Sequence, residues 1–135
     1  IPTAFVIATA VGTGIHLQSI NLPAPELIIS ASVLLIGIFL AQKNQVNWSL
    51  LAVSSAIAGI FHGYAYGEAI VGAETSALGA YLLGFCLIQL GISAIAFYLG
   101  KRIISQPNKS ILWLRFAGFS VCGVGFTFLS NIVLG

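Results

Sequence analysis

The sequence predicts an all-α fold, a polytopic transmembrane helical bundle whose five spans form a single transmembrane domain over residues 1–135. Of the 135 residues, 59% are hydrophobic and only 6% are charged, and the mean hydropathy is +1.06. A water-soluble domain needs a polar exterior that so few charges cannot supply, so lipid must be the outer solvent. The uncharged runs are longer than the roughly ten residues of a transmembrane strand and apolar on every side, which favours helices.

Five runs without a charged residue predict the five spans, because a helix needs about 20 apolar residues to cross the hydrocarbon core of a bilayer. The runs cover residues 1–25, 27–42, 44–67, 75–100 and 116–135. Residues that favour turns lie between spans at 21–25, 43–47 and 105–108, where the backbone can leave the helix. We therefore expect helices near 2–19, 24–42, 47–66, 74–100 and 109–134.

The basic residues predict the orientation, because short loops rich in Lys and Arg tend to stay in the cytoplasm. They gather in or beside two loops and are Lys43, Lys101, Arg102, Lys109 and Arg115. Two spans separate the loops, so both loops face the same side. We expect loops 43–47 and 101–109 to be cytoplasmic and the C-terminus to lie on the opposite side of a bacterial inner or internal membrane.

The histidines and acidic residues fall on the other side in this topology. They are His16, Glu26, His62, Glu68 and Glu74. Imidazole and carboxylate are ligands for divalent transition metals, whereas Lys and Arg repel cations. This segregation favours an outward-facing cation site. Chance sorting of so few residues is the alternative explanation.

The most specific local pattern covers residues 61–68, at the outer end of the third predicted span. His62 and Tyr66 are four residues apart, so they share one helical face and differ by about 40° around the axis. The glycines of this face leave room for a neighbouring helix or a hydrated ion; they are Gly59, Gly63 and Gly67. The structural alternative is a histidine that hydrogen-bonds across a helix interface, with glycines that serve packing only.

This pattern resembles the HupE/UreJ family of small bacterial membrane proteins associated with nickel or cobalt uptake. The family carries a Phe-His-Gly-x-Ala-His-Gly motif, which Phe61, His62, Gly63, Ala65 and Gly67 match. The segment 22–37 is similar to the family's Pro-x-x-Glu entry, with Glu26, into a Ser-Val-x-x-x-Gly helix, and 76–85 is similar to its Ser-Ala-x-x-Tyr-x-x-Gly-Phe segment. The resemblance thus covers residues 22–85, and the remainder agrees in hydropathy.

Two departures from the family pattern bear on the metal site. No segment matches the family's His-Pro-x-x-Gly-x-Asp-His motif, which lies in an opening helix, and the chain begins at Ile1 inside an apolar run. We therefore expect a helix upstream of this chain, whose ligands would reach the side of His62 and Glu26. The second departure is Tyr66, a phenol where the family has a second histidine.

Other polar residues have a structural interpretation first. His16 is interpreted as an interfacial histidine, with compensation for the histidine missing at Tyr66 as the alternative. Cys86, Gln89 and Ser93 form one polar stripe on the fourth span, which we expect to join helices.

Together these observations predict neither an enzyme nor a nucleic-acid-binding protein, because catalytic motifs and a phosphate-binding basic stripe are missing from the sequence. The resemblance implies a transporter or permease for a divalent transition metal, nickel before cobalt, with Ni²⁺ or Co²⁺ as cargo and no tightly bound cofactor. The candidate metal residues are His62, Glu26, Glu68, Tyr66 and His16. The alternative is a noncatalytic subunit of a larger membrane complex, with other membrane proteins or further copies of the chain as partners in the bilayer.

The topology predicts which positions a membrane-impermeant thiol reagent can reach. Asn44→Cys and Asn108→Cys should react only from the cytoplasmic side, and Gly72→Cys only from the other, because short basic loops are retained in the cytoplasm. Labelling of intact cells and of inverted vesicles measures this accessibility. Reaction of Asn44→Cys and Gly72→Cys from the same side would show that the five-span topology is wrong.

Overall fold

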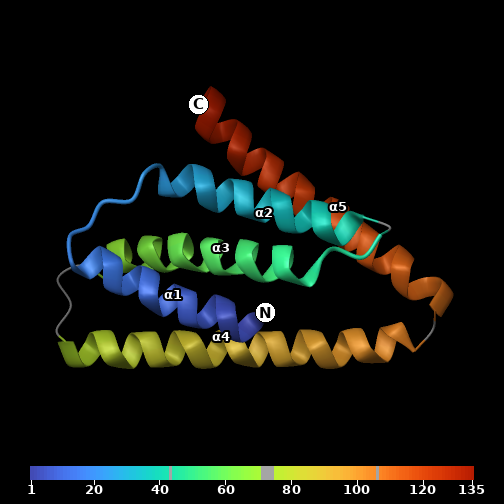
Figure 1. The fold of residues 1–135 in the computed structure, drawn as a ribbon, viewed down its shortest axis with the longest axis horizontal. Helices are drawn as coiled ribbons and strands as arrows, with labels where there is room; N and C mark the ends of the chain where they lie inside the picture. The colour runs from blue at the N-terminus through green and yellow to red at the C-terminus, as the bar shows by residue number, and fades with distance from the viewer. Residues whose placement is uncertain (43, 71–74, 106) are drawn as a thin grey trace.

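The computed structural model describes residues 1–42, 44–70, 75–105 and 107–135, and these form five helices (Figure 1). The helices are α1 (Pro2–Leu17), α2 (Pro25–Ala41), α3 (Trp48–Ala69), α4 (Thr75–Ile104) and α5 (Pro107–Leu134). The described residues contain no strand, so the all-α fold class is confirmed. Lys43, Gly72 and Glu74 lie outside the described residues.

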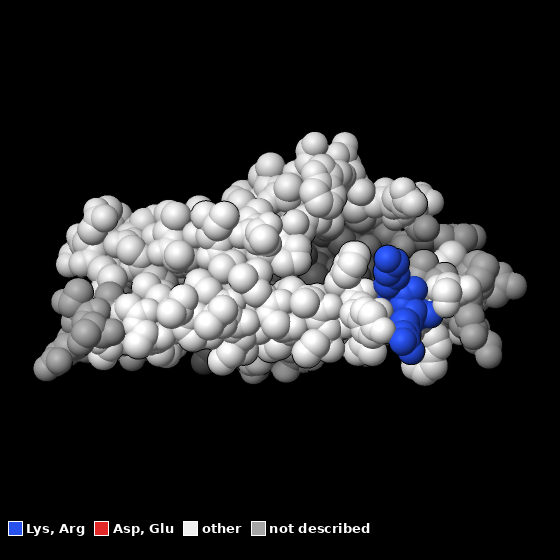
Figure 2. All heavy atoms as spheres, turned by 90° about the horizontal axis from the view of Figure 1, so that it is seen from below, with Lys and Arg blue, Asp and Glu red and all other residues white. Residues whose placement is uncertain are grey.

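Consecutive helices run in opposite directions, so their ends gather at two ends of the bundle (Figure 1). At one end α2 and α4 finish and α3 and α5 begin. We call it the basic end, because Lys101 and Arg102 lie in the last turn of α4 there. Figure 2 shows basic side chains gathered at that end of the α4 face. At the opposite end α1 and α3 finish and α2 begins.

Within the described residues, three helices contain a stretch long and apolar enough to cross a membrane: Trp48–Glu68, Gly79–Ile103 and Ile111–Leu134. The apolar helices α1 and α2 have 16 and 17 residues. At 1.5 Å per residue they are about 24–26 Å long, shorter than a hydrocarbon core of about 30 Å. A bilayer accommodates such short segments by local thinning.

The turn between α1 and α2 explains why both helices are short. Ser19 and Ala24 adopt left-handed backbone conformations, with φ of 59° and 42°. Such residues cannot continue a right-handed helix. Pro25 then begins α2, where its missing N–H is not needed.

Side-chain hydrogen bonds cap two helix termini near the basic end of the bundle. Asn47 caps α3, because its side-chain oxygen accepts a hydrogen bond of 2.9 Å from the Ser49 backbone N–H. Arg115 of α5 donates from Nε to the Ala41 carbonyl oxygen at the end of α2, at 3.2 Å. This bond satisfies a carbonyl that the helix cannot pair and ties α5 to α2.

The pairing of α1 with α3 depends on backbone contact at glycine. A Cβ atom added at Gly63 would overlap the Thr9 carbonyl group, and one added at Gly12 would overlap the Ile60 carbonyl group. Thr13 is fully buried between the helices, and its hydroxyl donates to the Gly63 carbonyl oxygen at 2.8 Å. Small residues thus let two parallel helices approach closely, and a threonine hydrogen bond joins them.

The pair α2 and α5 packs in the same way but antiparallel. A Cβ added at Gly37 would lie 2.5 Å from the Cys122 backbone nitrogen, and one added at Gly125 would lie 2.5 Å from that of Leu34. The contact of α2 with α3 joins the two pairs. Within the described part of the chain, the backbone of α4 comes close only to α1 and α5, and the Phe85 ring of α4 also meets Tyr66 of α3. The bundle therefore consists of two tightly packed pairs and one helix that largely faces outward.

The α1–α3 contact predicts a large effect of one methyl group. Gly63→Ala should lower the stability of the protein in detergent by about 1–3 kcal/mol, because the added methyl meets backbone that cannot move aside. Thermal unfolding followed by size-exclusion chromatography measures the change. The matched control is Gly91→Ala on α4, where nothing lies within 4 Å of the added Cβ. Equal melting temperatures in the two variants would contradict the importance of this contact.

Candidate metal site

His62 lies on α3 with one ring nitrogen already paired. Its Nδ1 is 2.8 Å from the Ala58 carbonyl oxygen, one turn earlier on the same helix. A carbonyl oxygen only accepts hydrogen bonds, so Nδ1 must carry the proton. In the neutral ring the lone pair is then on Nε2, which is the form that a metal ion binds. The Phe5 ring of α1 packs edge-on against the imidazole, with the ring centroids 5.6 Å apart.

The His62 ring lines a cavity of about 220 Å³ where α1, α2, α3 and α5 meet. Two serines share this cavity, Ser32 of α2 and Ser55 of α3, and apolar side chains line most of the remainder. The Ser32 hydroxyl donates to the Ile29 carbonyl oxygen at 2.7 Å. The site is therefore an imidazole at the junction of the two helix pairs, with hydroxyl groups nearby.

Tyr66 lies one turn beyond His62 on α3, on the shared face that the spacing predicts. Its ring packs against Phe85 of α4, with the centroids 4.3 Å apart, and Tyr81 lies next to Phe85. His62 and Tyr66 thus have different neighbours. His62 lies at the junction of the pairs, whereas Tyr66 packs on α4.

His16 packs against α3 near the opposite end of the bundle. Its ring meets the Tyr64 ring edge-on at 4.7 Å, and a Cβ added at Gly67 would lie 2.7 Å from the His16 Cβ. The Nδ1 atom is buried and has no hydrogen-bond partner within the described residues. The His16 ring therefore faces α3 in the last turn of α1. The Tyr64 side chain is buried.

Glu26 and Glu68 are both exposed at the opposite end of the bundle, Glu26 in the first turn of α2 and Glu68 near the end of α3. Across the described part of the chain, no three His, Cys, Asp or Glu side chains come close enough to hold one metal ion together. The described histidines and glutamates therefore do not form a group of three ligands. Of the predicted residues, His62 lines the cavity between the helix pairs.

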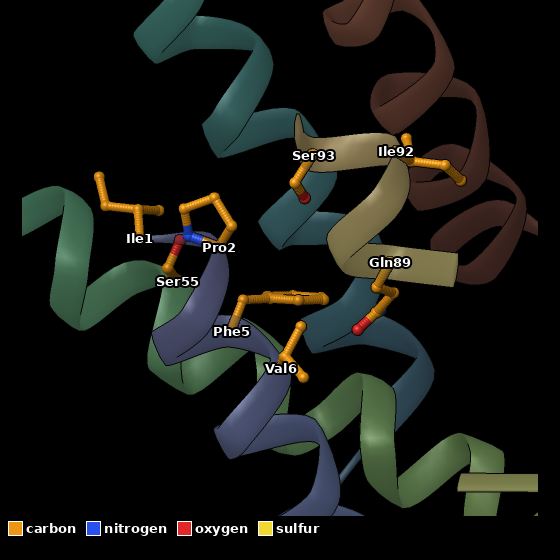
Figure 3. A pocket seen from close by; sticks show the side chains of 8 residues that line it. All are labelled: Ile1, Pro2, Phe5, Val6, Ser55, Gln89, Ile92 and Ser93. Carbon is orange, nitrogen blue, oxygen red and sulfur yellow. The ribbon is translucent and has the colours of Figure 1, made fainter. Parts of the chain in front are cut away.

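Two features near His62 escaped the sequence analysis. Ser55 lies seven residues before His62, which places both on the same face of α3, and it is buried. The seven-residue spacing from Ser55 to His62 is the sequence signal that could have indicated their shared face. It was missed because a single serine in an apolar run is common in membrane helices. Gln89 and Ser93 of α4, interpreted above as residues that join helices, line a second cavity of about 300 Å³. Figure 3 shows their polar ends directed from α4 toward α1.

Comparisons with known proteins agree with the resemblance found in the sequence. The family model described as HupE / UreJ protein matches residues 1–128. Protein HupE of Rhizobium leguminosarum bv. viciae is 27% identical over 113 residues, which cover 78% of this chain and 58% of the relative. The chain thus spans a little over half the length of that relative. No solved structure matches.

Proposed function

Because the chain belongs to the HupE/UreJ family, we propose that it moves a divalent transition metal across a bacterial inner membrane, as a transporter or permease rather than an enzyme. Nickel is the first candidate and cobalt the second. The loops 43–47 and 101–109 face the cytoplasm in this proposal, and the C-terminus faces the other side. The basic side chains at one end of the bundle support that orientation.

The observation that carries the proposal is the hydrogen bond from His62 Nδ1 to the Ala58 carbonyl oxygen. It orients the imidazole and leaves Nε2 as the nitrogen that can bind a metal, while the ring lines a cavity inside the bundle. Neutral imidazole is a good ligand for nickel and cobalt. An ionisable side chain within a membrane span is costly to maintain, which favours a functional role.

The carboxylates serve the same cargo in a different way. Glu26 and Glu68 are exposed at the end of the bundle opposite the basic residues. A negative potential at one end raises the local concentration of cations there. We propose that these two residues attract the metal to the outer side before it reaches His62.

Tyr66 and His16 are secondary candidates. The phenol of Tyr66 must usually lose its proton before it binds a metal, and its ring packs on Phe85. His16 has a buried Nδ1 without a hydrogen-bond partner in the described part of the chain. It offers a second imidazole nearer the outer side.

One observation favours the alternative role as a noncatalytic subunit of a membrane complex. The candidate span of α4, Gly79–Ile103, has none of its apolar window buried within the bundle. Such a face packs against lipid or against another membrane protein. A subunit that only packs would not need the imidazole of His62, so that residue separates the two functions.

The transport proposal predicts that nickel uptake depends on His62. His62→Ala should reduce the uptake of radioactive nickel by at least about tenfold, because a metal ligand is lost. Uptake is measured in nickel-limited cells that produce the full-length protein, with its amount in the membrane quantified in parallel. The control is Cys86→Ala on α4, which should leave uptake near normal. Near-normal uptake by both variants would leave His62 with a structural role and favour the subunit alternative.

A further inference from the structure

Ser55 lines three neighbouring, partly open cavities between the helices. One is the cavity of about 220 Å³ that contains His62. A second, of about 420 Å³, extends to the loop at the basic end, where Gln45 and Val46 line it. The third is the cavity of about 300 Å³ that Gln89 and Ser93 line (Figure 3). Ile36 also lines the first two of these cavities, and Ser55 is the residue common to all three.

The geometry of α3 gives this series of cavities a direction. Leu51, Ser55 and His62 are four and then seven residues apart, so they follow one face of the helix. Ser55 and His62 differ by about 10 Å along the axis, at 1.5 Å per residue. The cavities at this face therefore extend from the basic end of α3 to the imidazole.

Apolar side chains line most of these cavities, and each cavity also has two or three polar groups that can hydrogen-bond water. Ser55 is buried and lines all three cavities. The Gln89 side-chain oxygen is buried and has no hydrogen-bond partner among the described residues. An unpaired polar atom beside a cavity of this size is a typical place for bound water.

We propose that Ser55 is the junction of a hydrated route by which the divalent cation passes between His62 and the basic end of the bundle. The Ser55 hydroxyl hydrogen-bonds the water shell of the ion, and its small size keeps the two cavities joined. A branched apolar side chain at this position would fill the junction and remove the hydroxyl. The inference rests on the proposed function, because it takes the transported metal as the ion that uses the route.

The test uses the full-length protein with Cys86 and Cys122 replaced by alanine, so that the thiol reagent modifies only the introduced cysteine. Ser55→Cys is compared with Ser120→Cys. Ser120 lies on α5, is exposed, and donates its hydroxyl to the Phe116 carbonyl oxygen, so its side chain faces lipid. A positively charged methanethiosulfonate reagent applied from the cytoplasmic side should modify Ser55→Cys at least about tenfold faster, because a thiolate forms in water and not in lipid. Saturating nickel should slow the modification of Ser55→Cys.

Uptake of radioactive nickel completes the test. Ser55→Leu should lose most of its uptake, while Ser120→Leu at the lipid face should keep it. Modification of Ser55→Cys as slow as that of Ser120→Cys, or unchanged by nickel, would overturn the route. If nickel uptake still depended on His62 after that result, the transport proposal would stand and only the route through Ser55 would be wrong. If His62→Ala and Ser55→Leu both transported normally, both proposals would fail.

Discussion

The close approach of α1 to α3 is the contact on which the rest of the structure depends. Gly63 and Gly12 allow the two backbones to touch, and the buried Thr13 hydroxyl joins them across the interface. This approach brings the Phe5 ring against His62 and sets the imidazole at the edge of the second helix pair. In lipid, apolar side chains gain little from burial against one another, so small residues and interhelical hydrogen bonds decide which helices pair.

A membrane interior also decides how the polar side chains are used. Thr9, Thr13 and Ser32 donate their hydroxyl groups to backbone carbonyl oxygens. These groups are satisfied within the protein and stabilise it. Among the described residues, His62 is hydrogen-bonded at one nitrogen only, and Ser55 lines cavities. Side chains that are hydrogen-bonded to the backbone hold the helices together, whereas side chains that line cavities are available to bind a cargo.

Hydropathy was sufficient to predict the five helices and their order, because the spacing of charges reflects the thickness of a bilayer. Helix ends were harder to predict. Residues 105–108 have the composition of a turn, yet α5 begins at Pro107, a residue that suits the first turn of a helix. The sequence also identified His62 as a candidate metal ligand and predicted that the glycines of α3 leave room for a neighbouring helix. It did not indicate that Gln89 and Ser93 line a cavity, because a polar stripe has the same spacing whether it packs or faces open space.

The central claim is that His62 binds the transported metal through Nε2. X-ray absorption spectroscopy at the nickel edge tests it most directly, because multiple scattering from imidazole rings reports how many histidines bind the metal. Full-length protein loaded with nickel should show an imidazole contribution that decreases in His62→Ala while the metal is still bound by other ligands, or should fail to retain nickel in that variant. Identical nickel content and identical spectra for the wild type and His62→Ala would contradict the claim.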